Sequence, residues 1–211
     1  MPSAFRPLIL LAASLSLIAC TSNPAPPGAP PELTAPPALS DGWHAVFQTT
    51  KVIDAPLEPL QAWIGASNEI VAAMEETDQI KKPVEVKVVS GIWPEEGSVR
   101  WLKFSDGHYT YERVLENNLP ASFDYQVWGI TSSASDHITY ARGRQDWRTL
   151  ADGTSEFTWT YTLRPNSIIK RPFVSGFLSS DMKPFMEGAI GRMAAKAETE
   201  FAGWRASDAA Q

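Results

Sequence analysis

The chain has 211 residues, with 18 basic and 24 acidic side chains and a formal net charge of −6. An acidic chain without a cluster of lysines and arginines is not typical of a nucleic-acid-binding protein or of a protein held at a membrane by charge, so we expect no nucleic-acid partner. Its single cysteine excludes a disulfide within the chain, so the fold must be stabilised by its core.

The first 19 residues have the layout of a secretory signal peptide. Arg6 is the basic residue of the start, and an apolar run over residues 8–19 ends at Cys20. A helix of that length spans about 18 Å, whereas the hydrocarbon core of a bilayer measures about 30 Å. A transmembrane anchor is therefore the weaker alternative.

The residues Leu17-Ile18-Ala19-Cys20 resemble the lipobox of bacterial lipoproteins. In that family the cysteine thiol receives a diacylglycerol thioether and becomes the new N-terminus. The resemblance implies a signal peptide at 1–19, lipidation of Cys20 and a membrane partner reached through the lipid anchor. An ordinary signal peptide that happens to contain a cysteine is the alternative.

The residue after the cysteine is Thr21 rather than an aspartate. This resembles lipoproteins that are sent to the outer membrane of a two-membrane bacterium. We therefore expect a lipid-anchored protein of the cell envelope, at the outer membrane and facing the periplasm.

Residues 20–41 are predicted to combine the lipidated cysteine with a proline-rich linker. The stretch contains seven prolines and few large apolar side chains, so it cannot form a core of its own. Such a segment is a semi-rigid spacer of about 3.1 Å per residue, which could hold a domain up to roughly 60 Å from a bilayer. A proline-rich ligand for another protein is the alternative.

Residues 42–206 are predicted to form one domain, followed by a disordered tail at 207–211. β-Branched and aromatic stretches bounded by turn residues predict strands. They lie at 43–53, 84–90, 98–104, 109–116, 122–128, 138–149 and 155–164. Helices are expected at 54–64, with Asp54 as its cap, at 68–76, and at 182–204 after a cap formed by Ser-Ser-Asp181. A run of strands with helices at its start and end indicates an α+β fold with an antiparallel sheet.

The order of these elements, with several local sequences, resembles the START/polyketide-cyclase superfamily, also called SRPBCC or helix-grip. The local sequences are Ile53-Asp54-Ala55-Pro56 with Trp63, Gly97-Ser98-Val99-Arg100, Phe104-Ser105-Asp106-Gly107, Glu112-Arg113-Val114 before Leu119-Pro120, Asp152-Gly153-Thr154 and Arg164-Pro165. The resemblance implies a curved antiparallel sheet of about seven strands wrapped on a long C-terminal helix, with two short helices after the first strand. It also implies a space between the sheet and that helix.

Two hairpins decide which side chains face this space, since a slip of one residue exchanges the faces of a strand. For the hairpin at Asp152-Gly153 we favour a three-residue loop, which places Trp147 beside the aromatic side chains and leaves Arg142 and Arg144 in water; a two-residue turn would bury the arginines. For the hairpin at Asp106-Gly107 we expect a tight two-residue turn. That turn would place Arg100 and Arg113 on the inner side.

These registers give a set of candidate ligand-binding residues for an apolar molecule with a polar end. The set is Leu102, Phe104, Tyr109, Tyr111, Arg113, Phe123, Tyr125, Trp147, Phe157, Trp159, Tyr161, Met182, Met186, Ile190 and Met193. Arg113 is the candidate for binding an anionic head group through two parallel hydrogen bonds. The alternative is that these side chains simply form the core.

Residues that would support catalysis or metal binding are not grouped in the sequence. His44, His108 and His137 lie far apart, and no nucleophile motif or phosphate-binding glycine loop is present. The alternating charges at 142–148 are typical of a solvated strand face. We expect no catalytic residue, no metal and no cofactor.

The leading hypothesis is a non-enzymatic, membrane-tethered binding protein for a lipid or another hydrophobic small molecule. A cyclase or dehydratase of the same superfamily is one alternative. An envelope interaction protein without a cavity is the other. The sequence identifies no protein partner.

Overall fold

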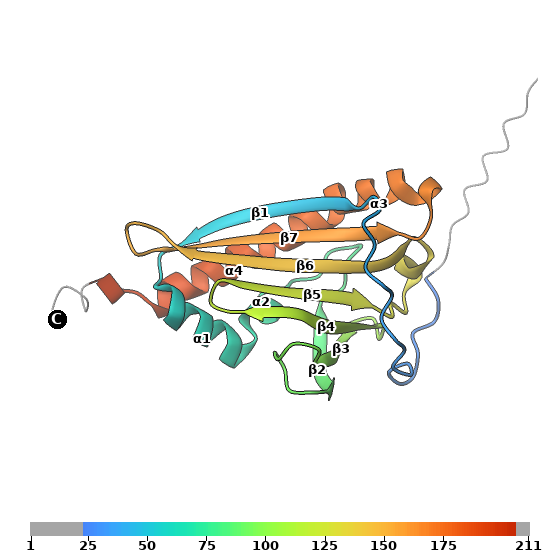
Figure 1. Cartoon of the computed structure of the whole chain (residues 1–211), viewed down its shortest axis with the longest axis horizontal. Coiled ribbons are helices and arrows are strands. Elements are labelled where there is room, and N and C mark those ends of the chain that lie inside the picture. Colours follow the sequence, from blue (N-terminus) through green and yellow to red (C-terminus); the bar gives the residue numbers. More distant parts are fainter. Residues whose placement is uncertain (1–22, 206–211) are drawn as a thin grey trace, which may run out of the picture.

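The computed structural model describes residues 23–205 (Figure 1). The predicted signal peptide, the lipidation site Cys20 and the predicted tail at 207–211 lie outside the described residues. The strands are β1 (Ala45–Ile53), β2 (Pro83–Ser90), β3 (Val99–Phe104), β4 (Tyr109–Asn118), β5 (Ser122–Trp128), β6 (Ile138–Thr149) and β7 (Ser155–Pro165). The helices are α1 (Leu57–Ser67), α2 (Glu69–Ala72), α3 (Arg171–Phe177) and α4 (Lys183–Glu200), with short helical turns η1 (Ser133–Asp136), η2 (Ile168–Lys170) and η3 (Leu178–Met182).

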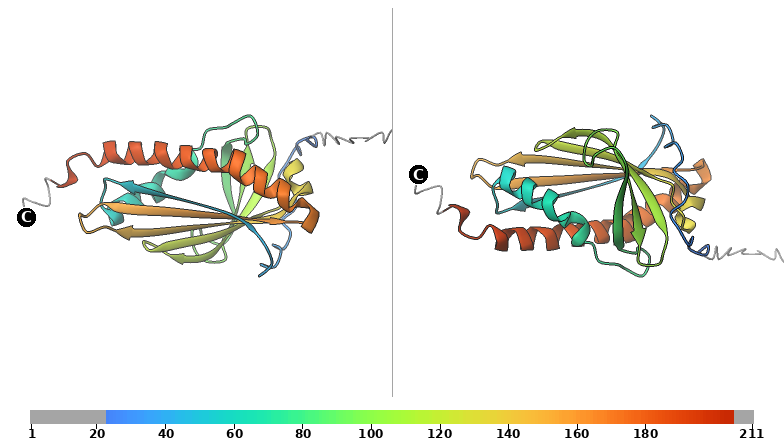
Figure 2. Two further views of the ribbon diagram at one scale, coloured as in Figure 1. Left: turned by 90° about the horizontal axis from the view of Figure 1, so that it is seen from above. Right: turned by 90° about the horizontal axis from the view of Figure 1, so that it is seen from below.

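The strands form one antiparallel sheet in the order β1-β7-β6-β5-β4-β3-β2. The first strand therefore pairs with the last, and β2 lies at the opposite edge. The sheet curves, and α4 runs along one of its faces (Figure 2). We call the face toward α4 the inner face and the other the outer face. The predicted α+β architecture is confirmed.

The C-terminal helix starts earlier than the sequence indicates. The predicted start at Met182 is wrong, because helical backbone already begins at Arg171 and continues through the wide turn η3 into α4. Asp181 lies inside this turn and caps no helix. Val174 and Leu178 are buried on the preceding turns, so packing against the sheet favours helix where the local sequence favours a cap.

The first helix also lacks its predicted cap. Pro56 occupies the N-cap position of α1 with extended backbone and makes no side-chain cap bond. The Asp54 carboxylate instead accepts hydrogen bonds from Trp204 Nε1 at 3.1 Å and from Arg205 Nε at 3.1 Å. Asp54 therefore joins the start of α1 to the end of the chain rather than capping the helix.

The structure confirms the predicted register of one hairpin and contradicts that of the other. In β6–β7, Trp147 pairs with Phe157, and their rings stack with centroids 3.9 Å apart, which confirms the predicted register. In β3–β4, Trp101 pairs with Tyr111. The predicted tight turn is wrong, because Phe104 N donates to His108 O across a loop of three residues, and the extra residue exchanges the faces of β4.

One continuous core lies between the inner face of the sheet, α1 and α4. Leu57, Leu60 and Ile64 of α1 are buried at helical spacing. On α4 the buried side chains are Phe185, Met186, Ala189, Ile190, Met193, Ala194 and Ala197. Within residues 23–205, no helix is both long and apolar enough to cross a membrane.

The proline-rich segment 23–41 differs from the free spacer that its composition indicates. It runs across the outer face of the sheet before joining β1 (Figure 1, blue). Tyr111 Oη donates a hydrogen bond to Pro31 O, Trp128 Nε1 donates to Thr34 O at 3.2 Å, and Gln126 Nε2 donates to Pro37 O at 2.8 Å. We call residues 23–41 the strap.

Beneath the strap lies a second, smaller apolar cluster on the outer face. Its members are Val99, Trp101, Tyr109, Tyr111, Trp128 and Tyr140. Ser40 N donates to the Tyr140 hydroxyl at 3.0 Å, and His44 Nε2 lies 2.8 Å from the same oxygen. A proline-rich extended segment makes no regular backbone hydrogen bonds of its own, so its carbonyls can accept hydrogen bonds from side chains of the sheet. The strap is thus part of the folded domain.

Candidate functional site

Three residues that pair across the sheet form the centre of the inner face. Tyr125 on β5 lies opposite Gly143 on β6, and Gly143 lies opposite Tyr161 on β7. The ring of Tyr125 occupies the space that a Cβ at position 143 would need. Glycine at 143 therefore lets the Tyr125 side chain lie flat across β6, toward Tyr161.

An ion pair stands beside these tyrosines. Arg100 Nε donates to Glu112 Oε2 at 2.8 Å, and the two side chains are only 12% and 10% exposed. The Arg100 guanidinium stacks 3.8 Å from the centroid of the Trp93 ring, and Trp93 packs edge-on against Phe123. The positive charge is thereby paired on one side and covered by an aromatic face on the other.

Tyr125 is buried in the main core, and the partly buried Tyr161 packs against it. Within residues 23–205, the indole Nε1 atoms of Trp147 and Trp159 beside them are buried without a hydrogen-bond partner. Burial raises the pKa of Tyr125 well above its usual range, and the nearby Tyr161 and Glu112 raise it further, whereas the Trp159 indole N–H opposes the rise. Burial and then Glu112 also raise the pKa of Tyr161. Both phenols are therefore neutral at physiological pH and available as hydrogen-bond donors.

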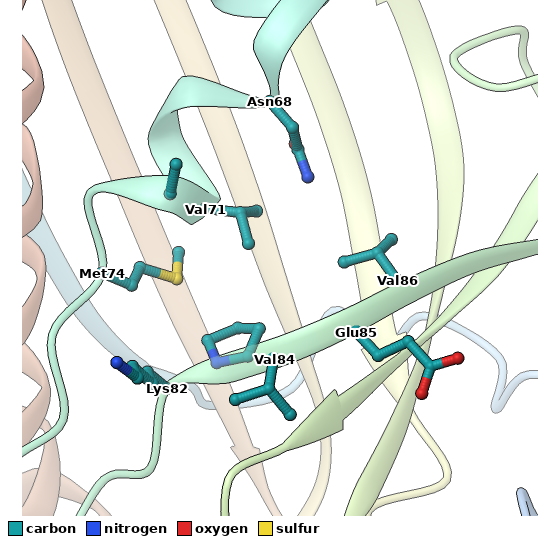
Figure 3. A pocket seen from close by; sticks show the side chains of 9 residues that line it. Asn68, Val71, Met74, Lys82, Val84, Glu85 and Val86 are labelled. Carbon is teal, nitrogen blue, oxygen red and sulfur yellow. The ribbon is translucent and has the colours of Figure 1, made fainter.

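A groove of about 500 Å³ opens between α2 and the edge strand β2 (Figure 3). The lining combines six apolar residues with three polar ones, Asn68, Lys82 and Glu85. The lining residues are Asn68, Val71, Ala72, Met74, Lys82, Pro83, Val84, Glu85 and Val86. Met74, which lines the groove, also packs against the main core.

The groove and the ion pair lie on the same face of neighbouring strands. Val86 pairs with Leu102, and Val88 pairs with Arg100, which in turn pairs with Glu112. Residues two apart in a strand share a face and are about 7 Å apart. The apolar wall of the groove therefore continues toward Arg100 and Glu112. This arrangement can hold an apolar body near the groove and a polar group at the ion pair and the tyrosines.

Solved structures of other proteins share this architecture. The chain is similar to Ara h 8.0201, with 13% identity, a TM-score of 0.52 and coverage of 72% of this chain and 99% of that one. It is also similar to ginseng major latex-like protein 151 from Panax ginseng (13% identity, TM-score 0.54, coverage 74% and 99%) and to a structural-genomics protein from Nitrosospira multiformis (16%, 0.53, 74% and 97%). The fold is a helix-grip fold.

No family model matches the chain. No curated protein matches it either. The three solved structures named above are at most 16% identical to this chain, so their similarity establishes the helix-grip fold alone. The function has to be argued from the site.

Most of the predicted binding residues lie on the inner face of the helix-grip fold. Leu102 is buried beside Val86, and Phe104 is half-buried two residues along the same face. The rest belong to the main core or pack against it: Phe123, Tyr125, Trp147, Phe157, Trp159, Tyr161, Met182, Met186, Ile190 and Met193. Whether they contact a ligand stays a prediction.

Three predicted residues face the other way. Tyr109 and Tyr111 lie in the outer cluster under the strap. Arg113 Nη2 donates to Gln126 Oε1 at 3.0 Å on the same outer face, so the predicted inward position of Arg113 is wrong. All three follow from the exchanged faces of β4. Arg100, which pairs with Glu112, is the inward-facing arginine of these two strands.

The alternating charges of β6 form ion pairs on the outer face. Arg142 binds the buried carboxylate of Asp124, with Nε to Oδ1 at 2.8 Å, and Arg144 binds Asp146 and Glu116. Among residues 23–205, no group of three histidine, aspartate or glutamate side chains is arranged so that it could hold a metal ion. The salt-linked strand face predicted for 142–148 is confirmed.

The sequence analysis did not predict Trp93, Gly143 or the groove residues as parts of the site. Trp93 lies in the loop before β3, outside any strand pattern. Gly143 lies between two arginines of β6 and has no apolar side chain, so alternation along the strand does not mark it as inward-facing. The groove residues of α2 and β2 are half-exposed, which gives them no periodic signal. Gly143 between Arg142 and Arg144 was the available signal, because glycine within a strand often marks a close approach.

Proposed function

We propose that this protein binds a lipid or another hydrophobic small molecule and is held at a membrane of the bacterial cell envelope through Cys20. The observation that carries the proposal is the pair of buried indole Nε1 atoms of Trp147 and Trp159, which have no hydrogen-bond partner within residues 23–205, on the same inner face as the Arg100–Glu112 ion pair. Buried polar groups without partners are costly, so a site that retains them is suited to a ligand that supplies the partners.

The chemistry of the surroundings narrows the ligand. The walls are aromatic and aliphatic, while the polar groups comprise two neutral phenols, one guanidinium and one carboxylate. A ligand with a long apolar part and one end that can accept hydrogen bonds, such as a carboxylate, an ester or a phosphate, fits this distribution. Its apolar part would occupy the groove between α2 and β2.

Native mass spectrometry of the full-length protein purified from cell membranes tests the proposal. We expect a co-purified ligand in addition to the covalent acyl chains, and uptake of added fatty acid or phospholipid. Ala72→Trp should reduce uptake about tenfold or more, because it fills the groove. Ala151→Trp, at an exposed alanine in the β6–β7 turn, should leave it unchanged.

A second candidate is an envelope interaction protein without a ligand. The continuous core between the sheet and α4 favours it, since side chains fill the centre of the fold. Absence of any co-purified or added ligand in the same experiment would overturn the binding proposal in favour of this alternative.

A further inference from the structure

An exposed apolar patch surrounds the start of the C-terminal helix. Ile168, Ile169 and Phe173 are 69%, 79% and 53% exposed, respectively. Two cations, Lys170 and Arg171, lie between them in the sequence. Three large, exposed apolar side chains within six residues, on η2 and the start of α3, are typical of an interaction site.

A partly exposed tryptophan, Trp43, belongs to the same patch. Trp43, just before β1, is 38% exposed, and the Arg171 guanidinium lies 5.2 Å from its ring centroid. Aliphatic side chains flanked by tryptophan and by basic residues have the composition of protein surfaces that lie at the boundary between lipid head groups and acyl chains.

The first described residue is fixed at this end of the domain. Asn23 Oδ1 accepts a hydrogen bond from Ser133 N at 2.9 Å, at the start of η1. At the end of η1, Asn166 Nδ2 donates to Asp136 O at 2.8 Å, and Ile168 follows two residues later. Figures 1 and 2 show the start of the strap, η1 and α3 together at one end of the molecule.

The length of chain between Asn23 and Cys20 limits how far the domain can stand from the anchor. Three residues span at most about 11 Å, even when fully extended. An acyl chain on Cys20 would therefore hold the η1 end of the domain within that distance of the bilayer. The patch lies at this end, whereas the β6–β7 hairpin lies at the opposite end (Figure 1).

We propose that the patch formed by Trp43, Ile168, Ile169, Lys170, Arg171 and Phe173 contacts the surface of the lipid bilayer. The inference rests on the proposed anchoring through Cys20. Ile168, Ile169 and Phe173 enter the interfacial region, and Lys170 and Arg171 meet the phosphates of the lipids. The strap then sets the orientation of the domain, with this end on the membrane and the β6–β7 hairpin away from it.

Fluorescent labelling of the acylated full-length protein in vesicles of phosphatidylethanolamine and phosphatidylglycerol tests this. Acylation blocks the thiol of Cys20, so a cysteine introduced at Ile169→Cys or Val52→Cys takes the label alone. Val52 is the matched control, since it is also an exposed aliphatic residue, at 46%, and lies beside the β6–β7 hairpin end. An environment-sensitive label on Ile169→Cys should emit at shorter wavelength and be quenched by lipids with brominated acyl chains, whereas the label on Val52→Cys should do neither.

Ile168→Asp beside the Ile169→Cys label should return its emission to that of a label in water. A protein that stays on the vesicles with both labels in water would overturn this inference alone. A shift without quenching would indicate a protein contact and would overturn it too. Loss of the protein from the vesicles would overturn the anchoring proposal and this inference with it.

Discussion

Tyr125 lies directly over Gly143, with its ring where the Cβ of any other residue at 143 would stand. A Cβ at this position would lie 2.6 Å from Tyr125 Cε1, well inside van der Waals contact. The aromatic ring therefore depends on the absence of a side chain on the neighbouring strand. This relationship fixes where the Tyr125 hydroxyl can reach on the inner face.

We expect Gly143→Ala to destabilise the protein by about 1–3 kcal/mol, because Tyr125 must leave its place in a packed core. Ligand binding should weaken as well, since the Tyr125 hydroxyl moves. Urea unfolding and the uptake assay measure the two effects. Gly191→Ala on α4 is the control, because a Cβ there meets nothing within 4 Å; a similar loss in Gly191→Ala would contradict the explanation.

Removal of the Tyr161 hydroxyl should affect binding rather than stability. Because Tyr161 is only partly buried, Tyr161→Phe should change the free energy of unfolding by less than about 0.5 kcal/mol. Ligand affinity should fall, which titration calorimetry measures.

Tyr140→Phe is the matched control for this prediction. Its hydroxyl oxygen contacts both Ser40 N and His44 Nε2, so its loss should cost about 1–3 kcal/mol of stability without changing ligand affinity. The opposite pattern in the two variants would show that the inner hydroxyl is structural.

The strap should contribute to the stability of the domain through Gln126. This buried side chain donates to Pro37 O and accepts from Arg113, so Gln126→Leu should cost about 1–3 kcal/mol by leaving both groups without a partner. The exposed amide of Gln48 bonds Thr160, and Gln48→Leu should cost less than about 0.5 kcal/mol. Equal losses in urea unfolding would mean that the strap is held by other contacts.

Acidification should destabilise the protein between pH 7 and pH 5. Burial lowers the pKa of His44 below 6.5 in the folded protein, and the positive charge of Arg164 lowers it further; burial and Lys170 act in the same direction on His137. Below pH 6.5 the unfolded chain then binds more protons than the folded one, so the free energy of unfolding falls as the pH falls.

Urea unfolding at pH 7, 6 and 5 measures this decrease, which should be smaller in the double variant His44→Gln/His137→Gln. An undiminished decrease would assign it to other groups. Asp152 and Glu156 have lowered pKa values, from hydrogen bonds to Thr154 and Arg148, and their contributions are lost at lower pH, as the carboxylates protonate.

Local patterns in the sequence were sufficient to predict the strands and the register of one hairpin. Alternation at 155–164 and the turn at Asp152-Gly153 predicted the register that brings Trp147 onto Phe157, because Gly153 adopts the left-handed conformation that a three-residue loop needs. The same dipeptide type at Asp106-Gly107 has the same kind of loop, but we expected a shorter turn there. One residue of difference exchanged Tyr111 and Arg113 with Thr110 and Glu112.

What the sequence determined by itself is the order of strands and helices and the alternation along each strand, since both arise from neighbouring residues. Only the tertiary structure decided which face of β4 is inner, because side chains on both of its faces are buried, one in the main core and one under the strap. The strap binds through backbone carbonyls at Pro31, Thr34 and Pro37, which composition cannot reveal. Composition reports side chains, whereas these contacts depend on what the opposite face of the sheet offers.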